Sequence, residues 1–268
     1  MGALATVRRH VGLLGVQLRL SALLAMQYRW ELFADAFFSL FWTATALLPL
    51  WLVFEERPRV AGYSFPEALV VLGFFTLLQG VLEGAIHPSL GTVVDHVRTG
   101  TLDFVLLKPA DAQFLVSTAR FAPFRVLNVL AGLAIVVHAL GLLGRAPSAL
   151  DVLASVVLFA SAVLILYGLW ILTVSAAFYV GRIDNLRYLF TSVFDAARWP
   201  ASVYRGALGF VFTYVLPLAL MTSYPAWALL GLLEPARFVT ALVFGLGFAL
   251  GSRWVFVRAL ARYTSASS

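Results

Sequence analysis

Long apolar runs separated by short charged segments form the main pattern of this chain. Because the hydrocarbon core of a membrane is about 30 Å thick, a helix crosses it with roughly 20 apolar residues. Six runs are predicted to cross in this way: residues 32–54, 67–87, 123–143, 150–180, 207–222 and 238–257. Apolar residues are continuous in these runs and do not alternate with polar ones, which is typical of helices. We therefore predict an all-α membrane protein with six transmembrane helices in one domain, residues 1–268.

The first 30 residues are apolar but carry polar groups that a span would not tolerate. Gln17 and Arg19 interrupt the apolar run, and no small-residue cleavage site follows it, so neither a span nor a signal peptide fits. Leu20 and Leu24 share one helical face. Residues 1–30 are therefore predicted to form an interfacial helix that lies along the membrane surface, with its arginines extended toward water.

Two later segments depart from the simple succession of spans and loops. Residues 181–206 contain several charges and an amphipathic stretch that ends near Pro200, and they are predicted to lie on the same side as residues 88–122. Residues 222–236 are largely apolar but too short to cross the membrane twice. They are predicted to form a re-entrant outer segment that other helices cover.

Composition agrees with a membrane protein. Mean hydropathy is +0.93 and only 12% of residues are charged, whereas a soluble domain has about a quarter. The chain has no cysteine, which excludes disulfides and thiolate-bound metals. The net charge of +6 does not require nucleic acid as a partner, because positive charge gathers on the cytoplasmic side of membrane proteins.

Arginine and lysine are distributed unevenly between the two predicted sides. With the N-terminus inside, the inner segments contain Arg8, Arg9, Arg19, Arg29, Arg98, Lys108, Arg120, Arg125, Arg182, Arg187, Arg198, Arg205, Arg253, Arg258 and Arg262. The outer segments contain Arg57, Arg59, Arg145 and Arg237. The positive-inside rule then predicts that both termini, the loop 88–122 and the segment 181–206 are cytoplasmic.

The loop 88–122 carries the richest polar pattern. Thr92 can cap a short helix that runs through Arg98, and Gly100 supplies a helix stop. An apolar stretch follows and ends at Lys108-Pro109, where proline prevents further helix. A short helix beside an apolar patch with charged edges is typical of a docking surface for a second protein. A solvated loop with an interfacial turn would give the same pattern, so both interpretations stay open at this point.

Glu83 and His87 are ionisable residues near the inner end of the second predicted span. They lie one helical turn apart and could pair with each other. An ionisable residue in a span indicates a place in a translocation path, and pairing at headgroup depth is the structural alternative. His138, in the third predicted span, is expected to be an interior hydrogen-bonded residue and not a metal ligand.

No motif for chemistry within the chain is present. A phosphate-binding loop needs a lysine followed by serine or threonine, and the single lysine, Lys108, is followed by Pro109. The serine-nucleophile and zinc-helix motifs are also absent, so no catalytic residue and no metal site is expected. Two glycine pairs have a spacing that permits close helix packing: Gly80 with Gly84, and Gly247 with Gly251.

Three stretches of this sequence resemble a known family. They are Arg98-Thr-Gly-Thr-Leu-Asp103-Phe-Val-Leu-Leu-Lys108-Pro109, then Ala197-Arg-Trp-Pro200-Ala-Ser-Val-Tyr204, and then Pro217 followed by Tyr224-Pro225-Ala226 and Gly231. In this order, over most of the chain, they resemble ATP-binding cassette type-2 export permeases. The resemblance implies six spans, an N-terminal interfacial helix, a first inner loop that couples to an ATPase, and a re-entrant outer segment before the last span.

The resemblance also implies partners and a location. Two permeases, identical or paralogous, are expected to pair in the bacterial cytoplasmic (inner) membrane and to bind two cytoplasmic ATPase subunits. Those subunits would bind ATP and Mg, and this chain itself would need no cofactor. Membrane lipid would be a further partner, and nucleic acid would not be one. The residues implied for ATPase coupling are Asp95, His96, Arg98, Gly100, Leu102, Asp103, Leu107, Lys108 and Pro109. Arg98, Asp103 and Lys108 would be polar contacts, and Leu102 and Leu107 apolar ones.

The sequence gives less direct information on the transported compound and on its path through the protein. Candidates for the translocation path are Glu83, His87, Tyr204 and Tyr224. An apolar, aromatic chain with few intramembrane charges favours an amphipathic or lipid-like compound as cargo. Two other functions stay open: a membrane scaffold that anchors an ATPase without transport, and an ion-coupled transporter. An ion-coupled transporter would need carboxylates deep in its spans and inverted repeats. Glu83 is the only candidate for such a carboxylate, and no convincing repeat is found.

Overall fold

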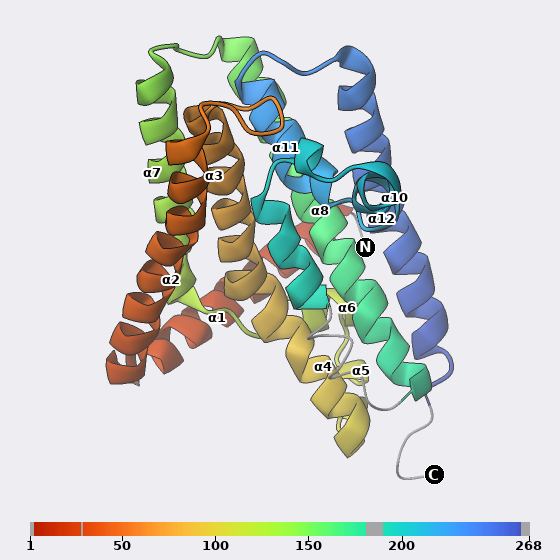
Figure 1. The fold of residues 1–268 in the computed structure, drawn as a ribbon. Helices are drawn as coiled ribbons and strands as arrows, with labels where there is room; N and C mark the ends of the chain where they lie inside the picture. The colour runs from red at the N-terminus through yellow and green to blue at the C-terminus, as the bar shows by residue number, and fades with distance from the viewer. Residues whose placement is uncertain (1–2, 28, 181–189, 264–268) are drawn as a thin grey trace.

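The computed structural model describes residues 3–27, 29–180 and 190–263 of the chain (Figure 1). The regular structure of these residues is helical, with one isolated bridge between Val60 and Tyr63. Five helices are long and apolar enough to cross a membrane: Phe33–Glu56, Phe65–Thr99, Pro123–Leu143, Ala149–Tyr179 and Pro235–Leu260. A bent pair, Gly206–Val215 with Leu218–Leu229, gives a sixth if it is counted as one span. The predicted all-α membrane fold is confirmed.

Two helices lie at the edge of the bundle. α1 (Ala3–Gln27) runs at a wide angle to the long helices, and α2 (Arg29–Glu56) rises along one side (Figure 1). Several aromatic side chains of α2 are exposed at the edge of the bundle, such as Phe33 at 63% and Phe37 at 64%. An apolar helix of this kind contacts lipid or another chain in a membrane. The interfacial position of α1 stays a prediction.

One line of helix runs the length of the bundle. α3 (Phe65–Val81) begins at a capping box in which the Ser64 N–H donates to the Glu67 carboxylate at 2.7 Å. A π-helical turn, Leu82–Ile86, joins α3 to α4 (His87–Thr99) without a break. The predicted separate helix capped at Thr92 is therefore wrong. Thr92 lies inside α4, which projects beyond the neighbouring helices (Figure 1).

We call the end of the bundle that carries residues 88–122 the loop end. The opposite end, which carries the α2–α3 turn at residues 57–64, is the turn end. α7 (Val126–Leu143) and α8 (Ala149–Val180) are joined at the turn end, and α8 finishes at the loop end (Figure 1). α12 (Pro235–Leu260) runs from the turn end to the loop end beside α8.

Small residues bring α3 close to α7. A Cβ added to Gly132 of α7 would lie 2.8 Å from the Leu77 nitrogen and 2.9 Å from the Gly73 oxygen, both in α3. Only a residue without a side chain permits this crossing. Gly80 also lies against α7, as its spacing predicts. The second predicted pair is wrong, because a Cβ on Gly247 or Gly251 would meet no atom within 4 Å.

Residues 190–205 pack against the bundle and are buried in part. Phe194 is 2% exposed, and its ring centroid is 5.3 Å from that of Phe75 in α3. The Ser202 hydroxyl donates to the Ala61 carbonyl at 2.8 Å, in the α2–α3 turn. The described part of segment 181–206 therefore extends to the turn end, so the prediction that it lies on the same side as residues 88–122 is wrong there. Residues 181–189 lie outside the described residues.

The bent pair follows and occupies the turn end. α10 (Gly206–Phe210) and the π-helical turn Val211–Val215 meet α11 (Leu218–Leu229) at an angle of 85°. The indole of Trp227 in α11 donates to the Tyr63 hydroxyl in the α2–α3 turn. Because Ser202 and Trp227 both contact this turn, the pair enters and leaves at the same end.

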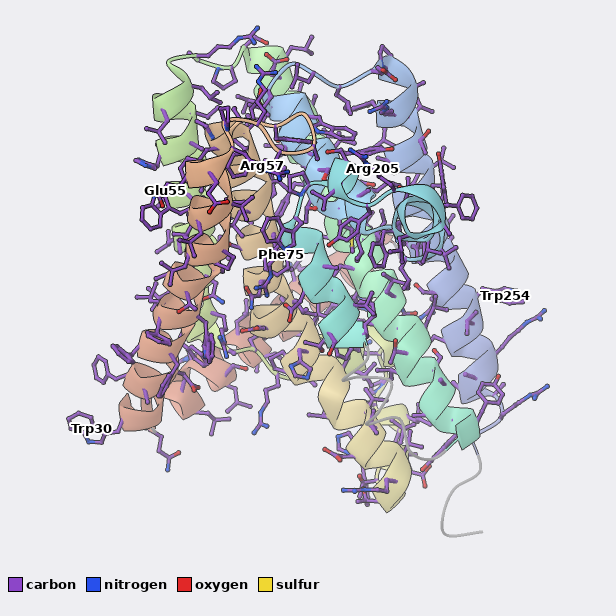
Figure 2. All side chains as sticks on the ribbon, in the orientation of Figure 1. Trp30, Glu55, Arg57, Phe75, Arg205 and Trp254 are labelled. Carbon is purple, nitrogen blue, oxygen red and sulfur yellow. The ribbon has the colours of Figure 1, made fainter. Side chains whose placement is uncertain are left out.

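This arrangement changes the predicted path of the chain. Residues 206–229 form a re-entrant segment, so the predicted fifth span 207–222 is wrong and the predicted re-entrant segment 222–236 begins too late. The chain instead returns from the loop end to the turn end between Val180 and Ser202. Arg205 consequently lies at the same end as Arg57 (Figure 2), which corrects its predicted inner position.

Candidate functional site

The loop end is shaped by the last turn of α4. Gly100 has a φ of 70° and ends the helix in the left-handed region, which confirms the predicted stop. His96 Nδ1 lies 2.7 Å from Thr101 Oγ1 and holds the chain as it leaves the helix. Asp95 and Arg98 form an exposed ion pair with an N–O distance of 3.4 Å. His96 and Gly100 therefore shape the turn, whereas Asp95 and Arg98 face outward.

α5 (Asp103–Leu106) lies between a buried leucine and an exposed one. Leu102 is 1% exposed, while Phe104 and Leu107 are 70% and 80% exposed. Lys108 and Pro109 are exposed beside them. Leu102 is thus an anchor in the core, which corrects its expected role as an apolar contact for a partner. We call the exposed residues Phe104, Leu107, Lys108 and Pro109 the loop-tip patch.

Asp103 opens α5 and is half-buried. It is therefore less available to a partner than Lys108. The loop-tip patch combines two highly exposed apolar side chains with one cationic side chain. The exposed Asp95 and Arg98 lie on the preceding helix, α4. Apolar residues surrounded by charges are typical of a protein interface.

A chain of polar contacts connects the loop to two long helices. Arg253 of α12 donates from Nη1 to Asp111 Oδ1 at 3.0 Å and from Nη2 to Asp111 Oδ2 at 2.6 Å. Arg253 Nη1 also donates to Gln113 Oε1 at 3.0 Å. Gln113 Nε2 in turn donates to the Tyr167 hydroxyl of α8 at 3.0 Å, and Ser117 Oγ lies 2.6 Å from that hydroxyl. These five residues are called the loop–span network.

Asp111 makes two kinds of contact in this network. Its carboxylate accepts from Arg253, and it also caps α6 (Ala112–Ser117) by accepting from the Phe114 N–H at 2.9 Å. Burial acts to raise the pKa of Asp111, but the hydrogen bonds from Arg253 and Phe114 outweigh it and the pKa falls below its ordinary 3.8. Asp111 is therefore ionised at neutral pH, and the connection to α12 is charge-assisted.

The segment after α6 is attached to α1 and to the π-helical turn. The Ala122 N–H donates to the Gly84 carbonyl at 2.8 Å. The Phe121 N–H donates to the Ser21 hydroxyl of α1 at 3.1 Å. A displacement of the loop tip would therefore be transmitted by these hydrogen bonds to α1, α3, α8 and α12.

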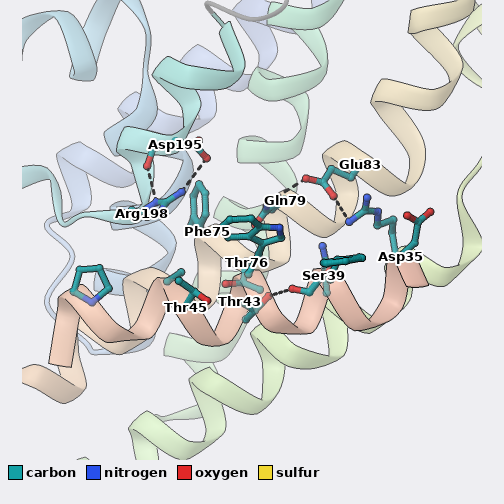
Figure 3. A pocket seen from close by; sticks show the side chains of 16 residues that line it. Asp35, Ser39, Thr43, Thr45, Phe75, Thr76, Gln79, Glu83, Asp195 and Arg198 are labelled. Carbon is teal, nitrogen blue, oxygen red and sulfur yellow. Dashed lines mark hydrogen bonds and ion pairs between the residues drawn. The ribbon is translucent and has the colours of Figure 1, made fainter. Parts of the chain in front are cut away.

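A cavity of about 570 Å³ lies between α2, α3, α7 and residues 195–198 (Figure 3). Its lining residues are Asp35, Phe38, Ser39, Trp42, Thr43, Thr45, Ala46, Pro49, Phe75, Thr76, Gln79, Glu83, Arg125, Asn128, Asp195 and Arg198. Asp35, Ser39 and Thr43 follow one another at four-residue spacing, which places them on one face of α2. The volume is in the range of small-molecule sites.

Two ion pairs lie in this cavity (Figure 3). Arg125 Nη1 is 2.5 Å from Glu83 Oε2, and Gln79 Nε2 donates to Glu83 Oε1 at 3.1 Å. Arg198 Nη2 is 3.1 Å from Asp195 Oδ1, and its guanidinium lies 5.4 Å from the Phe75 ring centroid. The predicted Asp195–Arg198 pair is confirmed, and its side chains, 48% and 33% exposed, lie in the cavity wall against α3.

Of the four predicted path residues, only Glu83 lines the cavity. His87 packs against Trp170, with ring centroids 5.2 Å apart. The Tyr204 hydroxyl donates to the Ala196 carbonyl at 2.8 Å, and Tyr224 is 7% exposed in α11. The ion pair of Glu83 is with Arg125, the residue directly before α7, because α7 faces this side of α3.

Metal-ligand clusters of three or more residues are absent from the described part of the chain. His138, expected in the interior, is an exposed residue of α7. The loop–span network and the cavity wall on α2 were not predicted. Asp111 and Arg253 are 142 residues apart, so no local pattern links them.

A model of the family described as ABC-2 family transporter protein matches residues 40–267. The match includes the loop end, the re-entrant segment, and all of the cavity wall except Asp35, Phe38 and Ser39. No curated protein and no solved structure matches the sequence.

Proposed function

Because the chain belongs to the ABC-2 family of transporter proteins, we propose that it is the membrane permease subunit of an ATP-driven exporter. ATP hydrolysis then resides in separate cytoplasmic subunits, two for each transporter. A second permease, identical or paralogous, completes the membrane part. The loop-tip patch is the surface to which an ATPase subunit binds.

The observation that carries this proposal is the connection between an exposed patch and the long helices. Leu107 is 80% exposed, and four residues later Asp111 enters the loop–span network that ends in α8 and α12. A partner that binds the patch differently in its two nucleotide states would favour two positions of these helices. Equal binding in both states would shift nothing, so the difference in affinity is what drives transport.

The cavity is the part of the proposed translocation path that belongs to one permease. Its polar wall lies among otherwise apolar helices, and α2 on its open side has exposed aromatic residues. An amphipathic cargo suits this combination, since a polar group can enter the cavity while an apolar tail contacts α2 or lipid.

The basic end of the molecule supports a cytoplasmic loop end. Arg98, Lys108, Arg120, Arg258 and Arg262 lie near the loop end, whereas Arg57, Arg59, Arg145, Arg205 and Arg237 lie near the turn end. α1 adds Arg8, Arg9 and Arg19, and Arg9 donates to the Pro109 carbonyl. The loop end therefore carries more arginine and lysine than the turn end, even with Arg205 counted at the turn end. We infer that both termini lie on the cytoplasmic side of a bacterial inner membrane.

Reconstitution with the cognate ATPase tests the function. We expect purified complex in liposomes to move an amphipathic cargo with ATP, and Leu107→Asp to abolish ATPase binding while the protein stays folded. Leu232→Asp is the matched control, because Leu232 is 55% exposed in the loop between α11 and α12 at the turn end. ATPase binding without any cargo movement would support a scaffold and reject the exporter.

A further inference from the structure

The hydroxyl groups of the cavity direct their protons away from it. Thr43 Oγ1 donates to the Ser39 carbonyl at 2.9 Å, and Thr45 Oγ1 donates to the Phe41 carbonyl at 2.8 Å. Thr76 Oγ1 donates to the Leu72 carbonyl at 2.9 Å. A hydroxyl has one proton but two lone pairs, so these groups retain acceptors only.

Some of the remaining donors have partners within the cavity. The Ser39 hydroxyl donates to Asn128 Oδ1, and Gln79 Nε2 donates to Glu83. Arg125 faces Glu83, and Arg198 donates from Nε to the Asp195 carbonyl as well as pairing with its carboxylate. The hydroxyl groups of the lining therefore offer a ligand acceptors.

The charge of the lining is negative. It contains the carboxylates of Asp35, Glu83 and Asp195 and the guanidinium groups of Arg125 and Arg198. Two of the carboxylates are neutralised by the two ion pairs. Asp35 forms no hydrogen bond or ion pair with the residues that the structure describes, so one negative charge is uncompensated.

Aromatic rings lie on the same face as this carboxylate. Phe38 and Trp42 follow Asp35 by three and seven residues on α2, which keeps all three on one side of the helix, and all three line the cavity. Aromatic faces attract cations through their quadrupole. A carboxylate without a partner, lone pairs and aromatic faces thus meet in one cavity.

We propose that the cargo bound in this cavity is an amphipathic organic cation, with its charge held near Asp35 and its apolar part against Phe38 and Trp42. This inference rests on the proposed exporter function and names the substrate class of its cavity. An anionic lipid or an acidic compound would instead face the uncompensated carboxylate.

Two probes of the same shape and opposite charge test the sign of the cargo. Purified protein in phosphatidylcholine nanodiscs is equilibrated with tetraphenylphosphonium or tetraphenylborate, and binding to empty nanodiscs is subtracted. We expect saturable binding of the cation and none of the borate. Equal or tighter saturable binding of the borate overturns the proposal, and so does the absence of saturable cation binding.

Substitution of the carboxylate tests its position. Asp35→Asn is expected to weaken tetraphenylphosphonium binding about tenfold, whereas Asp35→Glu retains it. Glu55→Gln is the matched control, because Glu55 is an exposed acid near the other end of the same helix (Figure 2). Unchanged binding in Asp35→Asn, or an equal loss in Glu55→Gln, overturns the assignment.

The binding measurement is independent of ATP, so its failure can be separated from failure of the exporter function. A complex that transports another compound with ATP but does not bind the cation rejects only the substrate class. Cation binding without ATP-driven transport by the reconstituted complex rejects the exporter and leaves the cation site in place.

Discussion

The guanidinium of Arg253 and the carboxylate of Asp111 form two hydrogen bonds, with N–O distances of 3.0 and 2.6 Å. Arg253 lies two turns before the end of α12, and Asp111 caps the short helix α6 in the loop. A bidentate contact fixes orientation as well as distance. The position of the loop is therefore set by α12, and through Gln113 and Tyr167 by α8.

We predict that Asp111→Asn uncouples the ATPase from the spans. The neutral amide keeps the shape but loses the ionic contact, so cargo-stimulated ATPase activity should fall several-fold while the ATPase still binds the loop-tip patch. The stability effect is small, because the two side chains are 46% and 39% exposed and such pairs contribute on the order of 0.5 to 1 kcal/mol. Unchanged stimulation would contradict the role of the contact.

The pH dependence of this contact provides a second readout. The folded state lowers the pKa of Asp111 below 3.8, so the contact stabilises the protein above that value and its contribution is lost as the pH falls through the folded pKa. The melting temperatures of wild type and Asp111→Asn should therefore differ at pH 7 and converge in acid. A constant difference from pH 7 to pH 3 would exclude ionisation of Asp111 as its cause.

The sequence predicts the long spans well because their signal is local. The predicted runs 32–54, 123–143, 150–180 and 238–257 agree with the helices to within about three residues at each end. Each is a continuous apolar run that ends at charges, glycine or proline, so hydropathy alone locates it. α4 is missed as an extension of α3, because its residues beyond His87 mix buried apolar side chains with polar ones and so end the continuous apolar run.

The segment 190–205 is misplaced for a different reason. Its charges, Asp195 and Arg198, suggest contact with water when they are considered separately. In the structure they pair with each other against the ring of Phe75 and remain 48% and 33% exposed in the cavity wall, so the charges do not require a position at the loop end. The cavity could not be predicted either, because its wall combines residues from four segments that only the fold brings together.

The Glu83–Arg125 pair is predicted to stabilise the α3–α7 contact. Their side chains are only 27% and 25% exposed, so removal of one leaves the other with an unpaired charge. Glu83→Gln or Arg125→Gln alone should lower the free energy of unfolding by about 3 kcal/mol. The double variant should lose much less than the sum, as measured by a double-mutant cycle in SDS unfolding. Additive losses would show that the two groups do not interact.

Gly132 is predicted to be irreplaceable at the crossing of α3 and α7. Gly132→Ala puts a methyl group 2.8 to 2.9 Å from atoms of Leu77 and Gly73, so the helices must separate. The expected loss in unfolding free energy is about 1 to 3 kcal/mol. Gly251→Ala is the control, since its methyl group would meet no atom within 4 Å, and it should be neutral or slightly stabilising. Equal effects of the two substitutions would contradict the close crossing.

The final prediction concerns the side of the membrane on which Arg205 lies. The chain has no cysteine, so single-cysteine variants can be labelled without background. Arg205→Cys and Arg145→Cys are exposed at the turn end, and both should react with a membrane-impermeant maleimide on intact cells. Lys108→Cys should react only after permeabilisation.

The outcome for Arg205→Cys separates two paths of the chain. If residues 181–206 stayed at the loop end, Arg205→Cys would label together with Lys108→Cys. The contact of Ser202 with Ala61, three residues before Arg205, instead requires that it label with Arg145→Cys. If Arg205→Cys reacted only after permeabilisation, as Lys108→Cys should, the chain would cross to the turn end after residue 205. The bent pair would then be a true span, since the chain must reach the turn end before α12 begins.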